Sequence, residues 1–207
     1  IRNNISVLLK HSSLSSANSI STLHVGLLIC KKKIDESIKK IEFPNHSLKK
    51  MMNLMNSAEN LRSLGIVLPP TPQAVALYLP ASRSGNLIYT SGQLPLKEGK
   101  LEIKGKVGES ATLDLAQSQA RLACLNALAA ILLHTDSLDK IQKIVKMGVY
   151  VASHPSFTEQ HLVANGASEL LIQIFGEKGK HARFAIGVSS LPLDAIVELE
   201  LVVEVKD

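Results

Sequence analysis

The chain has 207 residues and 45% apolar residues, which suits one ordinary domain with an extension. Its formal charge of +5 is unevenly spread, because residues 1–55 hold 9 Lys/Arg against 3 Asp/Glu whereas residues 56–207 hold 14 against 15. A nearly neutral globular part with only 3% aromatic residues argues against an extended nucleic-acid surface, and no apolar run reaches the length of a membrane span.

The N-terminal part has a composition of its own. Up to Lys33 it lacks acidic residues, is rich in Ser and Asn, and carries scattered Lys and Arg. This composition is typical of organellar transit peptides and also of disordered extensions. We therefore expect residues 1–55 to be a disordered or targeting extension and residues 56–207 to be the globular domain. The expected compartment is the cytoplasm, or a mitochondrion or plastid if residues 1–50 are a transit peptide.

A short helix and a β-hairpin are predicted at the start of the globular part. Ser57 is a suitable N-cap for a helix that Gly65 would end. Residues 74–79 and 86–91 predict two strands, and residues 81–85 have the composition of the turn between them.

The middle of the domain predicts helix, strand, helix. Thr112 is a good N-cap, and apolar residues follow it at helical spacing. Residues 141–152, rich in Ile and Val, predict a central strand, and Ser156 with Glu159 forms a capping box for a second helix that ends near Phe175. The predicted core stripe of the first helix includes Leu115, Leu122, Leu125, Cys124 and Leu128.

Residues 181–205 predict two half-buried antiparallel strands joined at Leu191-Pro192. In the first strand Phe184 and its alternate neighbours are expected to face the core. The other face carries Arg183 above small residues, which leaves room for a flat ligand, and a guanidinium matches a carboxylate well. The element order is β-β-α-β-α-β-β, an α+β plait with a mixed sheet and both helices on one face.

Several chemistries lack their motifs. The sequence has no glycine-rich phosphate loop and no Gly-x-Ser-x-Gly elbow, and no His pair stands with an acidic residue at metal-ligand spacing. Its two cysteines, Cys30 and Cys124, fit neither a disulfide framework nor a metal site, and His181 is expected to be structural or exposed. We expect no metal and no organic cofactor.

Two motifs together resemble one family. The segments NLIYTSGQLP (86–95) and HARFAIGVSSLPLDAIVELE (181–200) are similar to the YjgF/YER/UK family, also called the Rid or reactive-intermediate deaminase family. Some members carry an older label of endoribonuclease or translation inhibitor. The resemblance covers roughly residues 58–206. It implies a chorismate-mutase-like fold and a homotrimer with clefts between subunits.

The resemblance also assigns candidate site residues. It implies that Arg183 binds a substrate carboxylate and that Glu198 places or activates the hydrolytic water. The segment around Ser91 and Gly92 would line the pocket with its backbone. The remaining implied substrate-binding residues are Tyr78, Asn165 and Ala185. Two of them depart from the family pattern, because Ala185 stands where a Cys is common and Asn165 aligns only after a one-residue insertion.

The implied activity is hydrolysis of amino-acid-derived enamines or imines to 2-keto acids and ammonia, as in a 2-iminobutanoate/2-iminopropanoate deaminase. The first alternative is a trimer that binds small carboxylates without catalysis. The second is a ribonuclease or translation inhibitor, which the charge balance disfavours. From the residues alone, Arg183 and Glu198 could instead form a cross-strand ion pair. No membrane association is expected.

Overall fold

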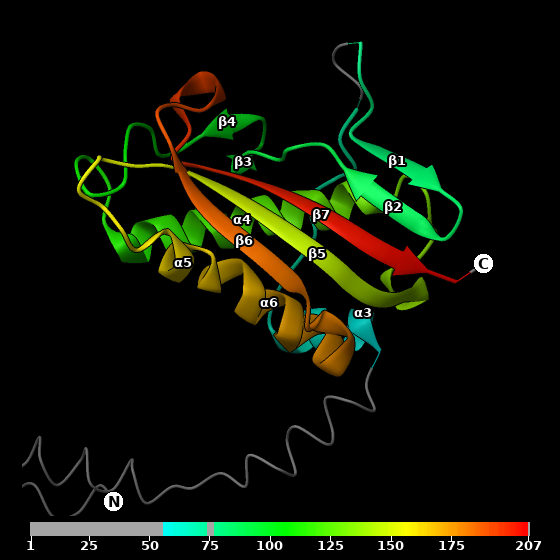
Figure 1. Cartoon of the computed structure of the whole chain (residues 1–207). Coiled ribbons are helices and arrows are strands. Elements are labelled where there is room, and N and C mark those ends of the chain that lie inside the picture. The colour runs from blue at the N-terminus through cyan, green and yellow to red at the C-terminus, as the bar shows by residue number, and fades with distance from the viewer. Residues whose placement is uncertain (1–55, 74–76, 207) are drawn as a thin grey trace, which may run out of the picture. The chain divides into compact units, whose positions relative to one another are not determined.

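The computed structural model describes residues 56–73 and 77–206 (Figure 1). The proposed extension, residues 1–55, lies outside the described residues. The first element is helix α3 (Ser57–Ser63). Its N-cap is Asn56, which forms a capping box with Glu59, so the prediction of Ser57 as the cap is wrong. Gly65 follows the helix with φ +66°, a conformation that glycine adopts easily, as predicted for the residue that ends the helix.

A five-stranded mixed sheet organises the domain. Its order is β1-β2-β7-β5-β6, and only β5 and β6 run parallel to each other. The bounds are β1 Ala81–Ser84, β2 Leu87–Thr90, β5 Ile141–Ala152, β6 Ala182–Val188 and β7 Val197–Val205. A separate small ribbon pairs β3 (Leu96–Lys97) with β4 (Lys100–Leu101). The prediction for β5 is confirmed over its whole length.

The first hairpin is displaced from its predicted position. The residues expected to form its turn are β1, and the reversal occurs at Gly85, whose φ is +58°. Residues 74–76 of the expected first strand lie outside the described part, and residues 77–79 are not in a strand. The sequence Ala-Ser-Arg-Ser has a composition typical of loops, but its pairing with β2 makes it a strand.

Helices α4 (Leu113–Ile131), α5 (Gln160–Val163) and α6 (Asn165–Phe175) cover one face of the sheet (Figure 1). Thr112 caps α4 by accepting a hydrogen bond from the Leu115 backbone N–H at 3.3 Å, as predicted. The second helical segment begins differently, because Glu159 is the N-cap of α5 and makes no side-chain cap, while Ser156 bonds to His154. The predicted capping box is therefore wrong, although the helical segment ends at Phe175 as expected.

Helix α4 packs on the sheet with small residues rather than with the predicted leucine stripe. Cys124 and Leu128 are fully buried as expected, but Leu122 and Leu125 are only half-buried. Small side chains allow the helix and the sheet to approach closely, so the larger leucines point elsewhere. The fully buried alanines of this face are Ala116, Ala120, Ala123, Ala127 and Ala130.

The predicted antiparallel pairing over 181–205 is wrong. Strands β6 and β7 do not pair with each other, because β5 lies between them. Strand β6 runs parallel to β5, and the 3-10 helix η3 (Pro192–Asp194) lies within the long connection to β7. Because sequence-adjacent strands with complementary alternation usually pair, the local pattern favours a hairpin that the sheet does not contain.

The two faces of β6 are also reversed relative to the prediction. Arg183 pairs with Met147, and Ala185 with Val149, so these residues point to the helix-covered face. Phe184 points to the opposite face, which no described helix covers (Figure 1). We call this second surface the open face. Period-two alternation separates the two faces of a strand but does not say which of them the helices cover.

Candidate active site

Arg183 is held on the helix-covered face at the edge of the sheet. Its Nη1 donates hydrogen bonds to Asn165 Oδ1 at 2.9 Å and to Ser168 Oγ at 3.0 Å, and its Nη2 donates to the His161 carbonyl at 3.2 Å. Asn165 and Ser168 are three residues apart on α6, so their side chains lie on one face of that helix. The structure therefore brings the predicted pair Arg183 and Asn165 together.

The guanidinium retains an unused edge. Of its five N–H groups, the hydrogen bonds with described residues engage both N–H groups of Nη1 and one of Nη2. The Nε–H and the second Nη2–H remain, and adjacent N–H groups of this kind form the fork that a carboxylate accepts. Since Arg183 is exposed in the single chain, this edge is open to a ligand or a neighbouring subunit.

The floor beside Arg183 is less open than predicted. Ala185 is half-buried against the core on the same face. A Cβ added at Gly187 would lie 2.9 Å from both Gln160 Nε2 and Ser153 Oγ, so side chains of this chain already cover that glycine. The flat space predicted above Ala185 and Gly187 is therefore shortened at its Gly187 end.

Glu198 lies on the open face beside the Thr-Ser-Gly-Gln segment. A Cβ added at Gly92 would overlap Glu198 Oε1, so the absence of a side chain at Gly92 makes room for the carboxylate. The backbone of Gln93 exchanges hydrogen bonds with Leu199 at 2.7 and 3.0 Å, which fixes this segment against β7. The structure thus brings together the predicted residues Gly92 and Glu198.

The surroundings of Glu198 favour its protonated form. Burial raises the pKa of Glu198 above its usual 4.5, and the neighbouring Glu200 raises it further. Tyr150, which pairs with Glu198 across the strands, also has a raised pKa because of burial, Glu200 and Glu198. A carboxyl group whose pKa is raised in this way is a better proton donor and acceptor partner than an ordinary surface glutamate.

Aromatic side chains line the rest of the open face. Tyr150 meets Phe184 edge-on with ring centroids 5.4 Å apart, and Lys146 Nζ lies 5.3 Å from the Phe184 ring centroid. Ile186 is 46% exposed and Tyr89 is 43% exposed. Large apolar groups beside Glu198 therefore remain in contact with solvent in the single chain.

Arg183 and Glu198 do not lie on the same face. Arg183 is in register with Met147 of β5 and Leu201 of β7, whereas Glu198 is in register with Tyr150 of β5 and Ile186 of β6. Met147 and Tyr150 are an odd number of residues apart on β5, so they project to opposite faces. Paired residues project to the same side of a sheet, so the guanidinium and the carboxylate project to opposite sides. The alternative of a cross-strand ion pair between them is therefore wrong, and Arg183 bonds to Asn165 and Ser168 instead.

Two further predicted residues lie near the segment before β1. Ser91 Oγ donates to the Leu79 carbonyl at 2.6 Å, and the Ser91 backbone N–H donates to Pro80 at 2.9 Å. These bonds hold the segment after Tyr78, a residue that is 59% exposed, against the segment after β2 that carries Gly92. The structure does not bring Tyr78 into hydrogen-bond contact with either Arg183 or Glu198 among the described residues.

The sequence interpretation missed Ser168, Tyr150 and Glu200. Ser168 could have been found, because it follows Asn165 by one helical turn. Tyr150 and Glu200 depend on the register between β5 and β7, which the local pattern does not encode.

Metal chemistry finds no support in the described part of the chain. No group of three or more His, Cys, Asp or Glu there is arranged to hold a metal ion. Cys124 is fully buried, and burial raises the pKa of its thiol to about 12, so it stays protonated.

Among the described helices, none combines the length and apolar character needed to cross a membrane.

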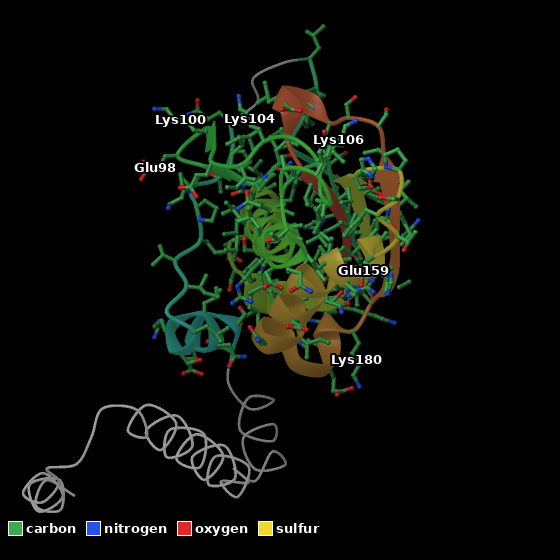
Figure 2. All side chains as sticks on the ribbon, turned by 90° about the vertical axis from the view of Figure 1, so that its left-hand side faces the viewer. Glu98, Lys100, Lys104, Lys106, Glu159 and Lys180 are labelled. Atoms are coloured by element: carbon green, nitrogen blue, oxygen red, sulfur yellow. The ribbon has the colours of Figure 1, made fainter. Side chains whose placement is uncertain are left out.

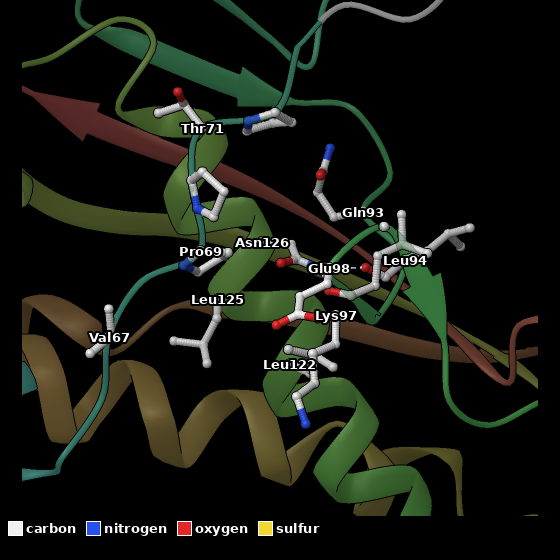
Figure 3. A pocket seen from close by; sticks show the side chains of 14 residues that line it. Val67, Pro69, Thr71, Gln93, Leu94, Lys97, Glu98, Leu122, Leu125 and Asn126 are labelled. Carbon is white, nitrogen blue, oxygen red and sulfur yellow. Dashed lines mark hydrogen bonds between the residues drawn. The ribbon is translucent and has the colours of Figure 1, made fainter.

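An apolar pocket of about 540 Å³ is lined by neither Arg183 nor Glu198 (Figure 3). Leu122, Leu125 and Asn126 of α4 form one wall, and the proline-rich segment 67–72 forms the other. Gln93 lines this pocket, whereas Arg183 and Glu198 do not. The half-buried leucines of α4 therefore face this pocket.

The charged surface is mixed in sign. Figure 2 shows Lys100, Lys104 and Lys106 with Glu98 toward the end of the molecule that carries β3 and β4. Lys97 there is paired with Glu102 at 3.0 Å. Alternating signs do not form the basic groove that gives nucleic-acid binding its electrostatic strength.

Comparison with known proteins identifies relatives of the whole globular part. A family model described as "YjgF/chorismate_mutase-like, putative endoribonuclease" matches residues 58–205. Protein TCP17 of Trypanosoma cruzi is 40% identical over 151 residues, covering 72% of this chain and 94% of the relative. The mitochondrial protein MMF1 of Saccharomyces cerevisiae is 30% identical over 131 residues, covering 63% and 77%.

Solved structures agree in fold. Atu1372 of Agrobacterium tumefaciens, a protein of unknown function, aligns with a TM-score of 0.67 at 40% identity, covering 78% of this chain and 96% of that one. An endoribonuclease candidate from Shewanella oneidensis aligns with a TM-score of 0.70 at 32% identity, covering 73% and 100%. Escherichia coli TdcF with bound serine aligns at 23% identity and a TM-score of 0.48, too distant to assign that ligand here.

The α+β fold, the match over nearly all of the globular part and these relatives lead to one conclusion: the chain belongs to the YjgF/RidA family, with its chorismate-mutase-like fold.

Proposed function

We propose that the protein hydrolyses small enamine or imine derivatives of amino acids to 2-keto acids and ammonia. The observation that carries the proposal is the arrangement of Arg183, whose Nη1 is fully engaged while its Nε–H and one Nη2–H are left for a carboxylate. A 2-imino acid presents a carboxylate next to the reacting carbon. Binding that carboxylate therefore also places the imine.

Glu198 supplies the acid–base group. Its carboxylate takes a proton from water as the water oxygen adds to the imine carbon, and it returns that proton to the imine nitrogen, which gives a carbinolamine. A second proton then passes from the carbinolamine hydroxyl to the nitrogen by way of Glu198, the C–N bond breaks, and ammonia leaves as the carbonyl forms. One water is consumed for each imine, and neither an oxidant nor a cofactor is needed. The raised pKa of Glu198 suits a group that first accepts and then returns a proton.

The site is proposed to form between copies of the chain, as a homotrimer with clefts between subunits. In one chain the two groups project from opposite faces of the sheet, so a substrate held by Arg183 cannot reach Glu198 of the same chain directly. The open face carries exposed Ile186 and Tyr89, which association would bury. A neighbour's open face brought against the Arg183 edge would complete the pair.

The test is the decay of 2-iminopropanoate generated enzymatically in the assay. Wild-type protein is expected to accelerate decay, and Arg183→Ala and Glu198→Gln are expected to lose most of that acceleration. Two matched variants serve as controls: Arg62→Ala, an exposed arginine on α3, and Glu204→Gln, an exposed glutamate on β7. Equal decay with and without wild-type protein would refute the deaminase activity.

The same arrangement supports a second candidate, a binder of small carboxylates without catalysis. It needs the free edge of Arg183 but not the proton transfer by Glu198. Pyruvate binding that is lost in Arg183→Ala, combined with no effect on imine decay, would favour this function. The ribonuclease alternative rests on the family description, and the paired Lys97–Glu102 surface gives it no basic groove.

A mitochondrial or plastid location is proposed on the composition of residues 1–50 and on the mitochondrial relative MMF1. Import of a fluorescent fusion of residues 1–55 would test it. Uniform cytoplasmic fluorescence of that fusion would contradict it.

A further inference from the structure

A series of hydrogen bonds runs from the Arg183 guanidinium to the carbonyl of the buried Gly179. Arg183 Nη1 donates to Ser168 Oγ at 3.0 Å, and Ser168 Oγ lies 3.2 Å from His181 Nε2. His181 Nδ1 lies 2.6 Å from the Gly179 carbonyl oxygen. Arg183 lies on β6, Ser168 on α6 and Gly179 in the 3-10 helix η2 (Gly176–Gly179), and His181 lies between η2 and β6, so the hydrogen bonds join three elements.

With a neutral His181 ring, the direction of every bond in this series of hydrogen bonds follows. A carbonyl oxygen only accepts, so His181 Nδ1 must carry the proton that points at Gly179. In a neutral imidazole, Nε2 is then the acceptor, and Ser168 O–H must donate to it. The Ser168 oxygen is left with lone pairs only, which accept from Arg183 Nη1. Every donor and acceptor therefore has one role.

The Gly179 end of this series of hydrogen bonds is rigid. Gly179 is buried, and a Cβ added there would overlap the Leu171 carbonyl of α6. The Gly179 carbonyl is thus fixed by close backbone packing rather than by a mobile side chain. Burial lowers the pKa of His181, the hydrogen bond to the Gly179 carbonyl opposes this, and the positive charge of Arg183 lowers the pKa further, so the net shift favours the neutral ring used in these bond directions.

We propose that Ser168 and His181 are positioning residues, which fix Arg183 so that its Nε–H and remaining Nη2–H face a ligand carboxylate. The proposal rests on the function assigned to Arg183 above. The two residues do not touch the substrate. Ser168 engages one Nη1–H and His181 orients the Ser168 hydroxyl, and together they prevent the guanidinium from turning to use a different edge. Asn165 engages the other Nη1–H, so the two α6 side chains hold Nη1 together.

The decisive comparison is Ser168→Ala against Ser168→Thr, with Ser118→Ala as the matched control on another helix. Within the described residues, Ser118 Oγ bonds locally, to the Leu115 carbonyl at 2.7 Å. Kinetics with 2-iminopropanoate and a titration with pyruvate are measured for each. We expect Ser168→Ala to raise KM and the pyruvate Kd about five- to tenfold, with kcat within about twofold, because ground-state and transition-state binding of the carboxylate weaken together.

The threonine variant keeps the hydroxyl and should restore KM and Kd to within about twofold of wild type. His181→Phe should weaken binding as Ser168→Ala does, and the double variant should be no weaker than either single variant, since both break one chain of bonds. Unchanged KM and Kd in Ser168→Ala, equal loss in the threonine variant, or additive losses would each overturn the proposal.

A measurement on the ligand-free protein separates this proposal from the function itself. In side-chain ¹⁵N NMR, the two Nη resonances of Arg183 should be distinct in wild type, because Nη1 is held, and should merge in Ser168→Ala. If the wild-type protein neither hydrolyses the imine nor binds pyruvate, the proposed function fails. The Arg183 spectrum still decides whether Ser168 and His181 fix the guanidinium, and merged resonances in wild type would show that they do not.

Discussion

Arg183 and Glu198 project from opposite sides of one sheet. Their partners on β5 are Met147 and Tyr150, which are three residues apart and therefore point to opposite faces. If one substrate needs both side chains, they come from different copies of the chain. Mixing two inactive proteins tests this directly. Arg183→Ala supplies Glu198, and Glu198→Gln supplies Arg183.

After the two variants are dissociated together and reassembled in equal amounts, we expect activity to return to about one quarter of the wild-type value, the fraction of shared sites with both side chains intact. Each variant treated alone should stay inactive. A mixture that also stays inactive, despite mass-spectrometric evidence of mixed oligomers, would show that each site draws both groups from one chain.

Gly92→Ala should impair catalysis without removing carboxylate binding. The new methyl group would occupy the position of Glu198 Oε1, so the carboxylate must move. We expect kcat to fall by about tenfold or more, because a displaced acid–base group loses its hydrogen-bond reach. The pyruvate Kd, which depends on Arg183, should change little. Adding Glu198→Asp, whose shorter side chain retreats from the methyl group, should recover part of kcat, and no recovery would argue against a steric cause.

The pH dependence of activity should reflect Glu198. Burial and then Glu200 raise its pKa above 4.5, and proton abstraction from water needs the ionised carboxylate. We therefore expect kcat/KM, corrected for spontaneous decay, to fall as the pH is lowered through this raised pKa. Glu200→Gln should shift that fall to lower pH, and Glu204→Gln should not. An identical profile in the Glu200 variant would contradict the assignment.

Glu198 also makes the unfolding free energy depend on pH, but in the opposite direction: a rise in pH that increases activity decreases stability. Between its ordinary pKa of 4.5 and its raised value, Glu198 holds a proton in the folded protein that the unfolded chain has released. Folding is therefore disfavoured as the pH rises through this window. Glu198→Gln should flatten this part of the dependence of the unfolding free energy on pH, which denaturant titrations at several pH values would measure.

Asp139 should stabilise the attachment of α3. It accepts hydrogen bonds from the Ser57 backbone N–H and from Ser57 Oγ, both at 2.6 Å. Burial alone would raise the pKa of Asp139, but these bonds and one from Ser137 outweigh it and lower the pKa. Asp139→Asn should reduce the unfolding free energy by about 1 kcal/mol at neutral pH.

The loss in Asp139→Asn should disappear in acid, because a lowered pKa gives stability above the unfolded value that vanishes as the pH falls through the folded one. Asp136→Asn is the matched control, since its ion pair with Lys140 spans 3.7 Å and its side chain is 77% exposed. That variant should change stability by only a few tenths of a kcal/mol. Equal losses in the two variants would contradict the role of Asp139.

The parts of the fold that were predictable are those fixed by local chemistry. Thr112 marks the start of α4, and the Ile/Val-rich segment 141–152 is β5, because capping and β-propensity act over a few residues. The motif pair 86–95 and 181–200 led to the family. The α+β class and the presence of two helices on one face also follow from element order.

The parts that were not predictable depend on contacts between distant segments. The insertion of β5 between β6 and β7 is a property of the whole sheet, so the alternation in 181–205 suggested a false hairpin. The same insertion determines that Arg183 and Glu198 project to opposite faces. Ser57 is a good cap by composition, but it bonds to Asp139, a partner far along the chain.

Strand β6 has a further consequence for how the protein must be handled. It forms one border of the sheet, so one row of its backbone groups has no strand partner among the described residues. An uncovered border beside the half-buried Phe184 and the exposed Ile186 is a template on which another chain can add a strand. Conditions that cover this border should therefore lower the tendency to aggregate, which light scattering at a constant protein concentration would measure.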